Sequence, residues 1–278
     1  MTYTTIHLHL TSHPAPTPPG TIDYACALAS VLGAKLRVSS THVVVHPPTN
    51  WIVGRMLTDF AREMQAAAAE KTKTLEMHAQ QAATACNVQI QLMPVTTHWP
   101  VGQQDESWRA RVSDVCVLGL TRGGVDSRLD IEDWLFGSGR PCILYPDTSR
   151  HVMSLENVVI CWDFSRSAAR AVNDALPLLH NAKTVRIAIF RGEKDIAVPD
   201  AGAQLIAFLA DHGVTAAAEE VEIGERTIGR AVLQHAEANR ADLIVVGAFG
   251  HSRMKEFLLG GATKELLDKS TIPLFMSH

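Results

Sequence analysis

Three glycines at fixed spacings are the feature of this sequence best suited to chemistry. Residues 247–263 read GAFGHSRMKEFLLGGAT, where two residues separate Gly247 from Gly250 and nine separate Gly250 from Gly260. Glycine lets a backbone turn sharply and lets its N–H groups approach an anion closely. The segment from Gly260 to Thr263 opens a predicted final helix, whose free N–H groups and dipole favour the same anion. The loop therefore predicts a phosphate cradle; alternatively, its glycines serve only the turns of an α/β protein.

Charged and titratable residues near this loop each have two interpretations. Asp163 follows a predicted strand and precedes a helix, so it contacts a ligand or only caps that helix. Arg253 and Lys255 neutralise phosphate or form a solvated face. His251 is interpreted as solvent-facing, because no partner acid or nucleophile can be assigned to it.

Histidines on two predicted strands raise a metal hypothesis. His7 and His9 share one face of their strand, and His42 and His46 lie on the next. Four such residues could approach a zinc site, or they are packed strand residues. No metal-ligand spacing, GxSxG elbow, P-loop Lys-Ser/Thr or HExxH is present. The sequence therefore assigns no metal site and no catalytic residue.

The elements that position the loop form a repeat. SDVCVLGLTRGG, from residue 113, matches ADLIVVGAFGHS, from residue 241: an apolar run ends in Gly119 or Gly247. Such a run is typical of a buried parallel strand that enters a tight turn. Each copy then closes with a proline and a short apolar strand, at Pro141 and Pro273. The repeat predicts two related halves.

Alternating strands and helices complete each half. The expected first-half elements are a strand at 4–10, a helix at 22–35, a strand at 36–45 and a long helix at roughly 52–86. Those of the second half are 157–164, 165–182, 185–190, 201–213, 216–223 and 226–240, with Ser165 as N-cap of the first helix. This alternation implies parallel sheets with helices on both faces. We expect domains at 1–150 and 151–278, each with its own five-stranded sheet and no continuous sheet through both.

Residues 241–278 carry a family resemblance. The G-x2-G-x9-G pattern follows an apolar strand that starts with Ala-Asp, and a Pro-led final strand comes after it. With WDFS at 162–165 and the two-half arrangement, this resembles the universal stress protein family in its tandem form. The resemblance implies two Rossmann-like domains of the adenine nucleotide alpha hydrolase type. It also implies that the closing strands CILYP and PLFMS lie near the interface between the halves.

The resemblance also implies roles for residues of the second half. They are Asp163 at the ribose or adenine side, phosphate contacts at Gly247, Gly250, Gly260, Gly261 and Ala262, and the hydroxyl of Thr263. ATP-binding relatives carry Ser or Thr directly after the third glycine, where this chain has Gly261. The missing hydrogen bond costs about 1 kcal/mol, so ATP binding is expected but weakened. AMP, ADP or an inorganic anion remain open, as does Mg²⁺ with the nucleotide.

The first half departs further from this pattern. Arg122 stands where the second glycine would be, and SHPAPTPPG replaces the turn that contains the Asp. We expect no nucleotide there by the same mode. The halves should form an intramolecular pseudo-dimer, and the sequence leaves a further homodimer open.

Composition limits the other function classes. Hydrophobic residues are 46% and charged residues 19%, enough apolar material for packed cores. Basic residues form no run that predicts nucleic-acid binding, and no apolar stretch reaches about 20 residues. The five cysteines form no CxxC and the first residues resemble no signal peptide, which favours a reduced cytoplasmic protein.

Three functions follow from these observations. The first is a nucleotide-binding stress or signalling module without rapid turnover, favoured by the glycine spacing of the second half. The second is an interaction protein without nucleotide, favoured by Gly261 and the eroded first half. The third is an enzyme, at most a slow ATP hydrolase, for which no metal-holding acid or water-positioning group can be named.

Overall fold

Strands and helices alternate along the whole chain. The computed structural model describes residues 2–12, 15–45, 54–99, 106–121, 125–192, 200–248 and 261–278. The first half contains β1 (Thr5–Leu10), α1 (Pro19–Leu32), β2 (Lys35–Val45), α2 (Gly54–Ala85), β3 (Ile90–Trp99), the 3-10 helix η1 (Ser107–Val112), β4 (Val115–Leu120), α3 (Val125–Gly137) and β5 (Cys142–Pro146). The second half contains β6 (Asn157–Cys161), α4 (Arg166–Leu179), β7 (Thr184–Arg191), α5 (Ala201–Asp211), β8 (Ala216–Glu222), α6 (Ile228–Ala238), β9 (Leu243–Gly247), α7 (Gly261–Lys269) and β10 (Leu274–Ser277).

The ten strands of the described residues belong to one sheet. Its order is β3-β2-β1-β4-β5-β10-β9-β6-β7-β8, and each half contributes five strands that are parallel to one another. The halves meet where β10 pairs antiparallel with β5, with Phe275 opposite Ile143. The prediction of a five-stranded parallel unit in each half is confirmed. The prediction of two separate sheets is wrong, because the closing strands use each other's free edges.

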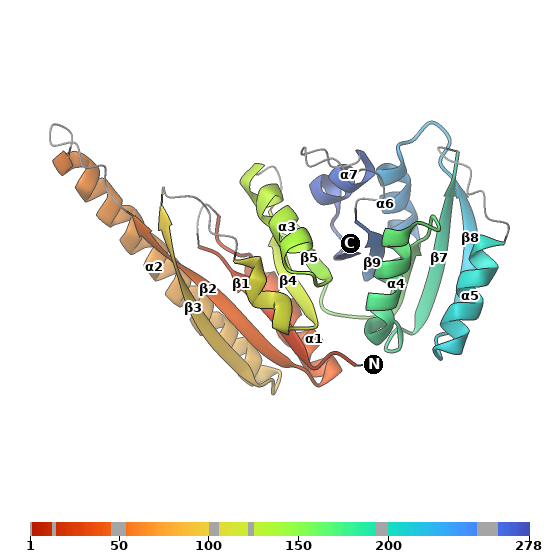
Figure 1. Cartoon of the computed structure of the whole chain (residues 1–278), viewed down its shortest axis with the longest axis horizontal. Helices are drawn as coiled ribbons and strands as arrows, with labels where there is room; N and C mark the ends of the chain where they lie inside the picture. Colours follow the sequence, from red (N-terminus) through yellow and green to blue (C-terminus); the bar gives the residue numbers. More distant parts are fainter. Residues whose placement is uncertain are drawn as a thin grey trace.

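The same junction confirms that the closing strands lie at the interface. Every residue of β5 and of β10 is buried, and Phe275 is fully enclosed. Figure 1 shows the first half, coloured red to green, beside the green-to-blue second half, with β5 and the C-terminal strands between them. The hydroxyl of Tyr3 also donates across the interface to the backbone carbonyl of Asp174 in α4.

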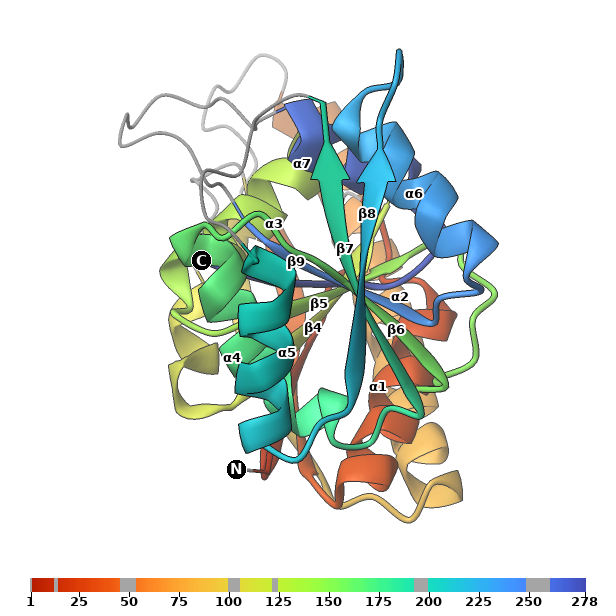
Figure 2. The same cartoon turned by 90° about the vertical axis from the view of Figure 1, so that its right-hand side faces the viewer.

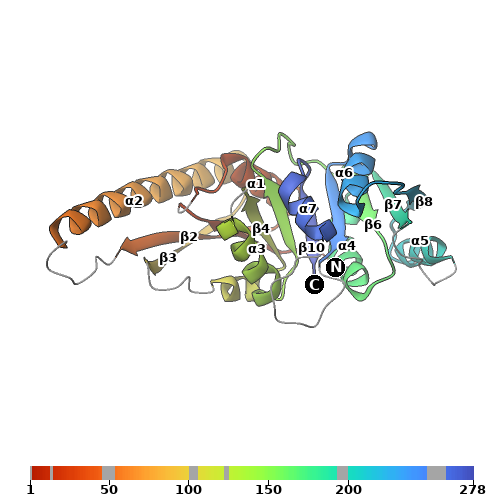
Figure 3. The same ribbon diagram turned by 90° about the horizontal axis from the view of Figure 1, so that it is seen from above.

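Helices cover both faces of the sheet, so the fold has three layers (Figures 1 and 3). One apolar core lies under α1, α2, α4 and α5 and continues across both halves. The other lies on the opposite face, under α3, α6 and α7, and it too contains residues of both halves. Seen along the sheet, the strands fan out with the twist that strands of L-residues adopt (Figure 2).

Equivalent aspartates hold equivalent strands in the two halves. The Asp114 carboxylate accepts from the N–H groups of Thr4 and Thr5 at 2.7 and 2.9 Å. The Asp242 carboxylate accepts from the Asn157 N–H at 2.9 Å, at the start of the corresponding strand β6. The sequence repeat therefore corresponds to the same aspartate-to-strand hydrogen bonds in both halves. All five cysteines are free thiols, as expected.

Candidate functional site

The second half has a topological switch point between β6 and β9. From β6 the chain continues outward to β7 and β8, then returns to the other side of β6 for β9 and β10. Because both neighbouring strands are parallel, their carboxyl ends meet at one edge. Ligands of open α/β sheets bind in the crevice outside such a point, since the following loops separate there. Asp163 follows β6 and Gly247 ends β9, so the sheet brings these two predicted site residues to the same edge.

Asp163 lies in a tight turn before α4. Its Oδ1 accepts from the Ser165 N–H at 2.9 Å, and Phe164 between them has φ 60°. Ser165 then caps the helix, because its Oγ accepts from the Ala168 N–H at 3.1 Å. The prediction that Ser165 is the N-cap is confirmed, and the side-chain cap of α4 is not Asp163. The exposed Asp163 carboxylate shapes the turn and lies at the mouth of the switch point.

Gly247 is required by packing against α4. A Cβ there would lie 2.4 Å from the Ala168 nitrogen and 2.5 Å from the Ser167 carbonyl carbon. Both are backbone atoms, so neither can move aside cheaply. The glycine therefore brings the end of β9 against the first turn of α4, which is a different reason from the phosphate approach that the spacing suggested.

The remaining predicted residues lie at the start of α7. Gly261 is its exposed first residue, Ala262 is half-buried and Thr263 is buried. No heavy atom lies within 4 Å of a Cβ built on Gly261. Two other predicted contacts, Gly250 and Gly260, lie outside the described residues, as do His251, Arg253 and Lys255.

A polar contact fixes α7 against α6. The Thr227 hydroxyl donates to Glu265, and Lys269 bonds the other carboxylate oxygen at 2.8 Å. The hydrogen bonds from Lys269 and Thr227 lower the pKa of Glu265, so it is ionised at neutral pH. The sequence analysis missed this contact, whose only local signal is the i, i+4 spacing of Glu265 and Lys269.

The four-histidine zinc arrangement does not form with His42. His7 and His9 share one face of β1, where both bond Ser39. The His42 side chain lies on the other side of the sheet, 3.1 Å from Glu76 of α2. His46 lies outside the described residues, and within them no three His, Cys, Asp or Glu side chains are placed to hold a metal ion.

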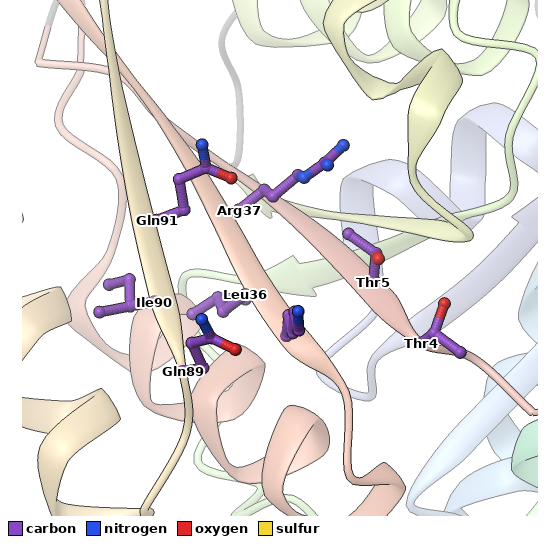
Figure 4. A pocket seen from close by; sticks show the side chains of 8 residues that line it. Thr4, Thr5, Leu36, Arg37, Gln89, Ile90 and Gln91 are labelled. Atoms are coloured by element: carbon purple, nitrogen blue, oxygen red, sulfur yellow. The ribbon is translucent and has the colours of Figure 1, made fainter.

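A hollow of about 450 Å³ lies at the opposite ends of the strands in the first half. Its walls include Thr4, Thr5, Arg37, Gln89 and Gln91, and Figure 4 shows these side chains on three neighbouring strands. It adjoins the amino ends of β1, β2 and β3. Because open sheets bind ligands at carboxyl ends, its size does not make it the binding site.

These features define a class of protein: two tandem doubly wound α/β halves, each with a topological switch point in its sheet. The family model of the Universal stress protein family matches residues 154–278. This match identifies the second half of the chain as a universal stress protein domain. Across the part of the chain that the structure describes, no helix is both long and apolar enough to cross a membrane.

Individual relatives agree with this assignment. "Universal stress protein Slr1230" of Synechocystis sp. (strain ATCC 27184 / PCC 6803 / Kazusa) is 36% identical over 55 residues, which cover 20% of this chain and only 19% of that protein. A universal stress protein from Archaeoglobus fulgidus DSM 4304 has a similar structure, with a TM-score of 0.69, 18% identity and coverage of 98% and 97%. A functionally unknown protein from Pseudomonas aeruginosa PAO1 matches at a TM-score of 0.59 and 11% identity, over 99% and 92% of the two chains. At such identities these two structures share the fold alone, and they share it over both halves.

Proposed function

We propose that the second half binds an adenine nucleotide, ATP foremost, at the switch point between β6 and β9. Phosphates would contact backbone N–H groups at Gly247, Gly250 and the segment 260–263. Asp163 would lie on the ribose or adenine side. Mg²⁺ that accompanies ATP would be bound chiefly through phosphate oxygens and water.

One observation carries this proposal: the Asp163 turn and Gly247 lie together at the carboxyl edge of two adjacent strands. Gly247 abuts Ser167 and Ala168, two to three residues beyond the turn. The glycine-spaced loop leaves the sheet at this place, and α7 begins where the loop ends. A helix start adds roughly half a positive charge from its unpaired N–H groups, which favours phosphate.

The cellular role that fits is a cytoplasmic stress-response or signalling module that holds nucleotide without rapid turnover. We place its domain boundary near residue 150 and regard the two halves as an intramolecular pseudo-dimer, with a further homodimer open. The alternative is an interaction protein without nucleotide, which Gly261 favours because it lacks the hydroxyl of ATP-binding relatives.

Two measurements separate these functions. Mass spectrometry of the purified protein should find adenine nucleotide, and calorimetry should measure its binding to the nucleotide-stripped full chain. Gly250→Val and Gly260→Val should abolish binding, because a branched side chain obstructs close backbone approach. Gly213→Asn, which lies just after α5, is the control that should bind as wild type, because asparagine tolerates the φ of 74° at this position. Unchanged affinity in Gly260→Val, or nucleotide in the first half instead, would show that the site assignment is wrong.

A further inference from the structure

Two histidines, a serine and a tryptophan form a buried polar cluster in the first half. The Ser39 Oγ lies 2.9 Å from His7 Nε2 and 3.0 Å from His9 Nδ1. The Trp134 ring from α3 covers both imidazoles, with centroids 5.2 and 4.7 Å away. His7, Ser39 and Trp134 are buried, whereas His9 is half-buried.

The second half shows that the fold does not need this cluster. Ile6 of β1 pairs with Val115 of β4, and Val158 of β6 pairs with Leu243 of β9 in the same way. Val159 and Cys161 therefore occupy the positions in the second half that His7 and His9 occupy in the first. His9 pairs with Ser39 as Cys161 pairs with Ala188. Burying polar groups costs free energy unless their hydrogen bonds are satisfied, and the same positions pack well without them. The polar cluster therefore needs a reason other than the fold.

The hydrogen bonds of Ser39 determine the tautomer of His9. Ser39 has one proton and contacts two imidazole nitrogens, so it donates to one and accepts from the other. His7 Nδ1 is buried without a hydrogen-bond partner. If Ser39 donated to His7, that orphan nitrogen would carry a proton, and buried N–H groups without acceptors are rarer than unsatisfied acceptors. Ser39 therefore donates to His9 Nδ1, and the His9 proton resides on Nε2.

Both imidazoles are neutral at physiological pH. Burial lowers the pKa of His7 to about 3, with smaller contributions from His9, Arg37 and Arg109. Burial alone lowers the pKa of His9 to about 4. His9 is thus a neutral imidazole whose Nε2–H is available to donate.

His9 lines a hollow at the switch point of the first half. The hollow has a volume of about 60 Å³ and lies at the carboxyl ends of β1 and β4. Its walls include Leu118, Gly119, Ile131, Trp134 and Pro16, together with Thr11, Thr17 and Thr121. No Asp, Glu, Lys or Arg is among the described residues that line it. A water needs roughly 10–15 Å³ in this measure, so the hollow holds about five non-hydrogen atoms.

We propose that this hollow is a ligand site for a small uncharged carbonyl compound, an amide or ketone of about five non-hydrogen atoms or the end group of a larger one. The carbonyl oxygen accepts from His9 Nε2–H, and the apolar part of the ligand contacts Leu118, Ile131 and Trp134. The described lining offers no cation to offset the desolvation of a carboxylate, so an uncharged acceptor fits it better. The site does not depend on nucleotide binding in the second half.

Long-range ¹H–¹⁵N NMR of the histidine rings in the full chain tests the proposal. Before any ligand is added, the His9 proton should reside on Nε2. Titration with N,N-dimethylformamide, an uncharged acceptor of five non-hydrogen atoms, should shift the His9 Nε2 and Trp134 indole signals saturably, with a Kd on the order of millimolar for so small a ligand. Sodium acetate, the charged control of similar size, should leave them unchanged.

Two variants isolate the contribution of the cluster. The triple variant His7→Val, Ser39→Ala, His9→Cys installs the residue types that the second half already packs, so the fold should persist. Its affinity for dimethylformamide should fall at least about fivefold, the value of one net hydrogen bond. His42→Gln, on the opposite face of β2, should bind as wild type. A proton on His9 Nδ1, unsaturable shifts, or equal affinity in the triple variant would overturn the proposal; the tautomer measurement stands even if that variant does not fold.

Discussion

Replacing Gly247 by alanine should destabilise the second half strongly, because the new methyl group would collide with backbone. The built Cβ lies 2.4 Å from the Ala168 nitrogen, 2.5 Å from the Ser167 carbonyl carbon and 2.9 Å from Ala168 Cα. Carbon atoms that pack well are about 3.5–4.0 Å apart, so β9 and α4 would have to separate by roughly 1 Å or more. Overpacking of this kind costs about 1–3 kcal/mol. The Ala168 N–H also bonds the Ser165 cap, whose loss adds about 1 kcal/mol.

We therefore expect Gly247→Ala to lower the free energy of unfolding by about 2–4 kcal/mol. Urea denaturation followed by circular dichroism measures this as a lower midpoint at unchanged slope. Two glycines provide matched controls. Gly119→Ala, the equivalent change in the first half, meets the Pro18 Cδ at 2.7 Å and should cost less, because its other nearest atoms are 3.3 Å or more away, whereas Gly247→Ala meets three atoms below 3 Å. Gly261→Ala meets nothing within 4 Å and should be neutral. A Gly247→Ala midpoint equal to that of Gly261→Ala would refute the packing role.

Three further predictions concern the site, the helix cap and the histidine cluster. Gly261→Ser should tighten ATP binding about fivefold in calorimetry, because it adds a hydroxyl where no atom is in the way; weaker binding would contradict this. Ser165→Ala should lower the free energy of unfolding by about 1 kcal/mol through loss of the α4 cap, and an unchanged urea midpoint would speak against that role. Because the pKa values of His7 and His9 are lowered in the folded state, the unfolded chain binds more protons below about pH 6.5, and stability should fall by a few kcal/mol between pH 6.5 and 4. The urea midpoint should fall less steeply over this pH range in the triple variant His7→Val, Ser39→Ala, His9→Cys. Parallel curves for variant and wild type would disprove that the two histidines cause the pH dependence.

The elements of this fold could be predicted because their signals are local. The cap at Ser165, the apolar strand that ends in Gly247 and the long helix α2 all appear where the residues indicate. The single sheet was mispredicted, although a signal was present. CILYP shows no alternation and is buried throughout, which is typical of a strand covered on both faces and paired on both edges. If β5 were an edge strand between two layers of helices, the N–H and C=O groups along its outer edge would have no partners.

The site was harder to predict, because contacts between distant segments determine it. Spacing identified Gly247, but only the approach of α4 explains why a Cβ is excluded there. The alternation of His7 and His9 was visible in the sequence. Their common partner Ser39 lies about 30 residues away and Trp134 more than 120, so neither could be assigned from local pattern.

The antiparallel junction gives the first half a structural role that does not depend on any ligand. Strand β10 pairs with β9 on one edge and with β5 on the other, and its Phe275 is fully buried. Without β5, the second half would expose a flat apolar edge, which is prone to aggregation. The first half therefore serves the fold through β5, irrespective of any ligand at its own switch point. The residues at the carboxyl ends of β1 and β4 take no part in that strand pairing, so the cluster of His9 and Trp134 there is not needed for the junction.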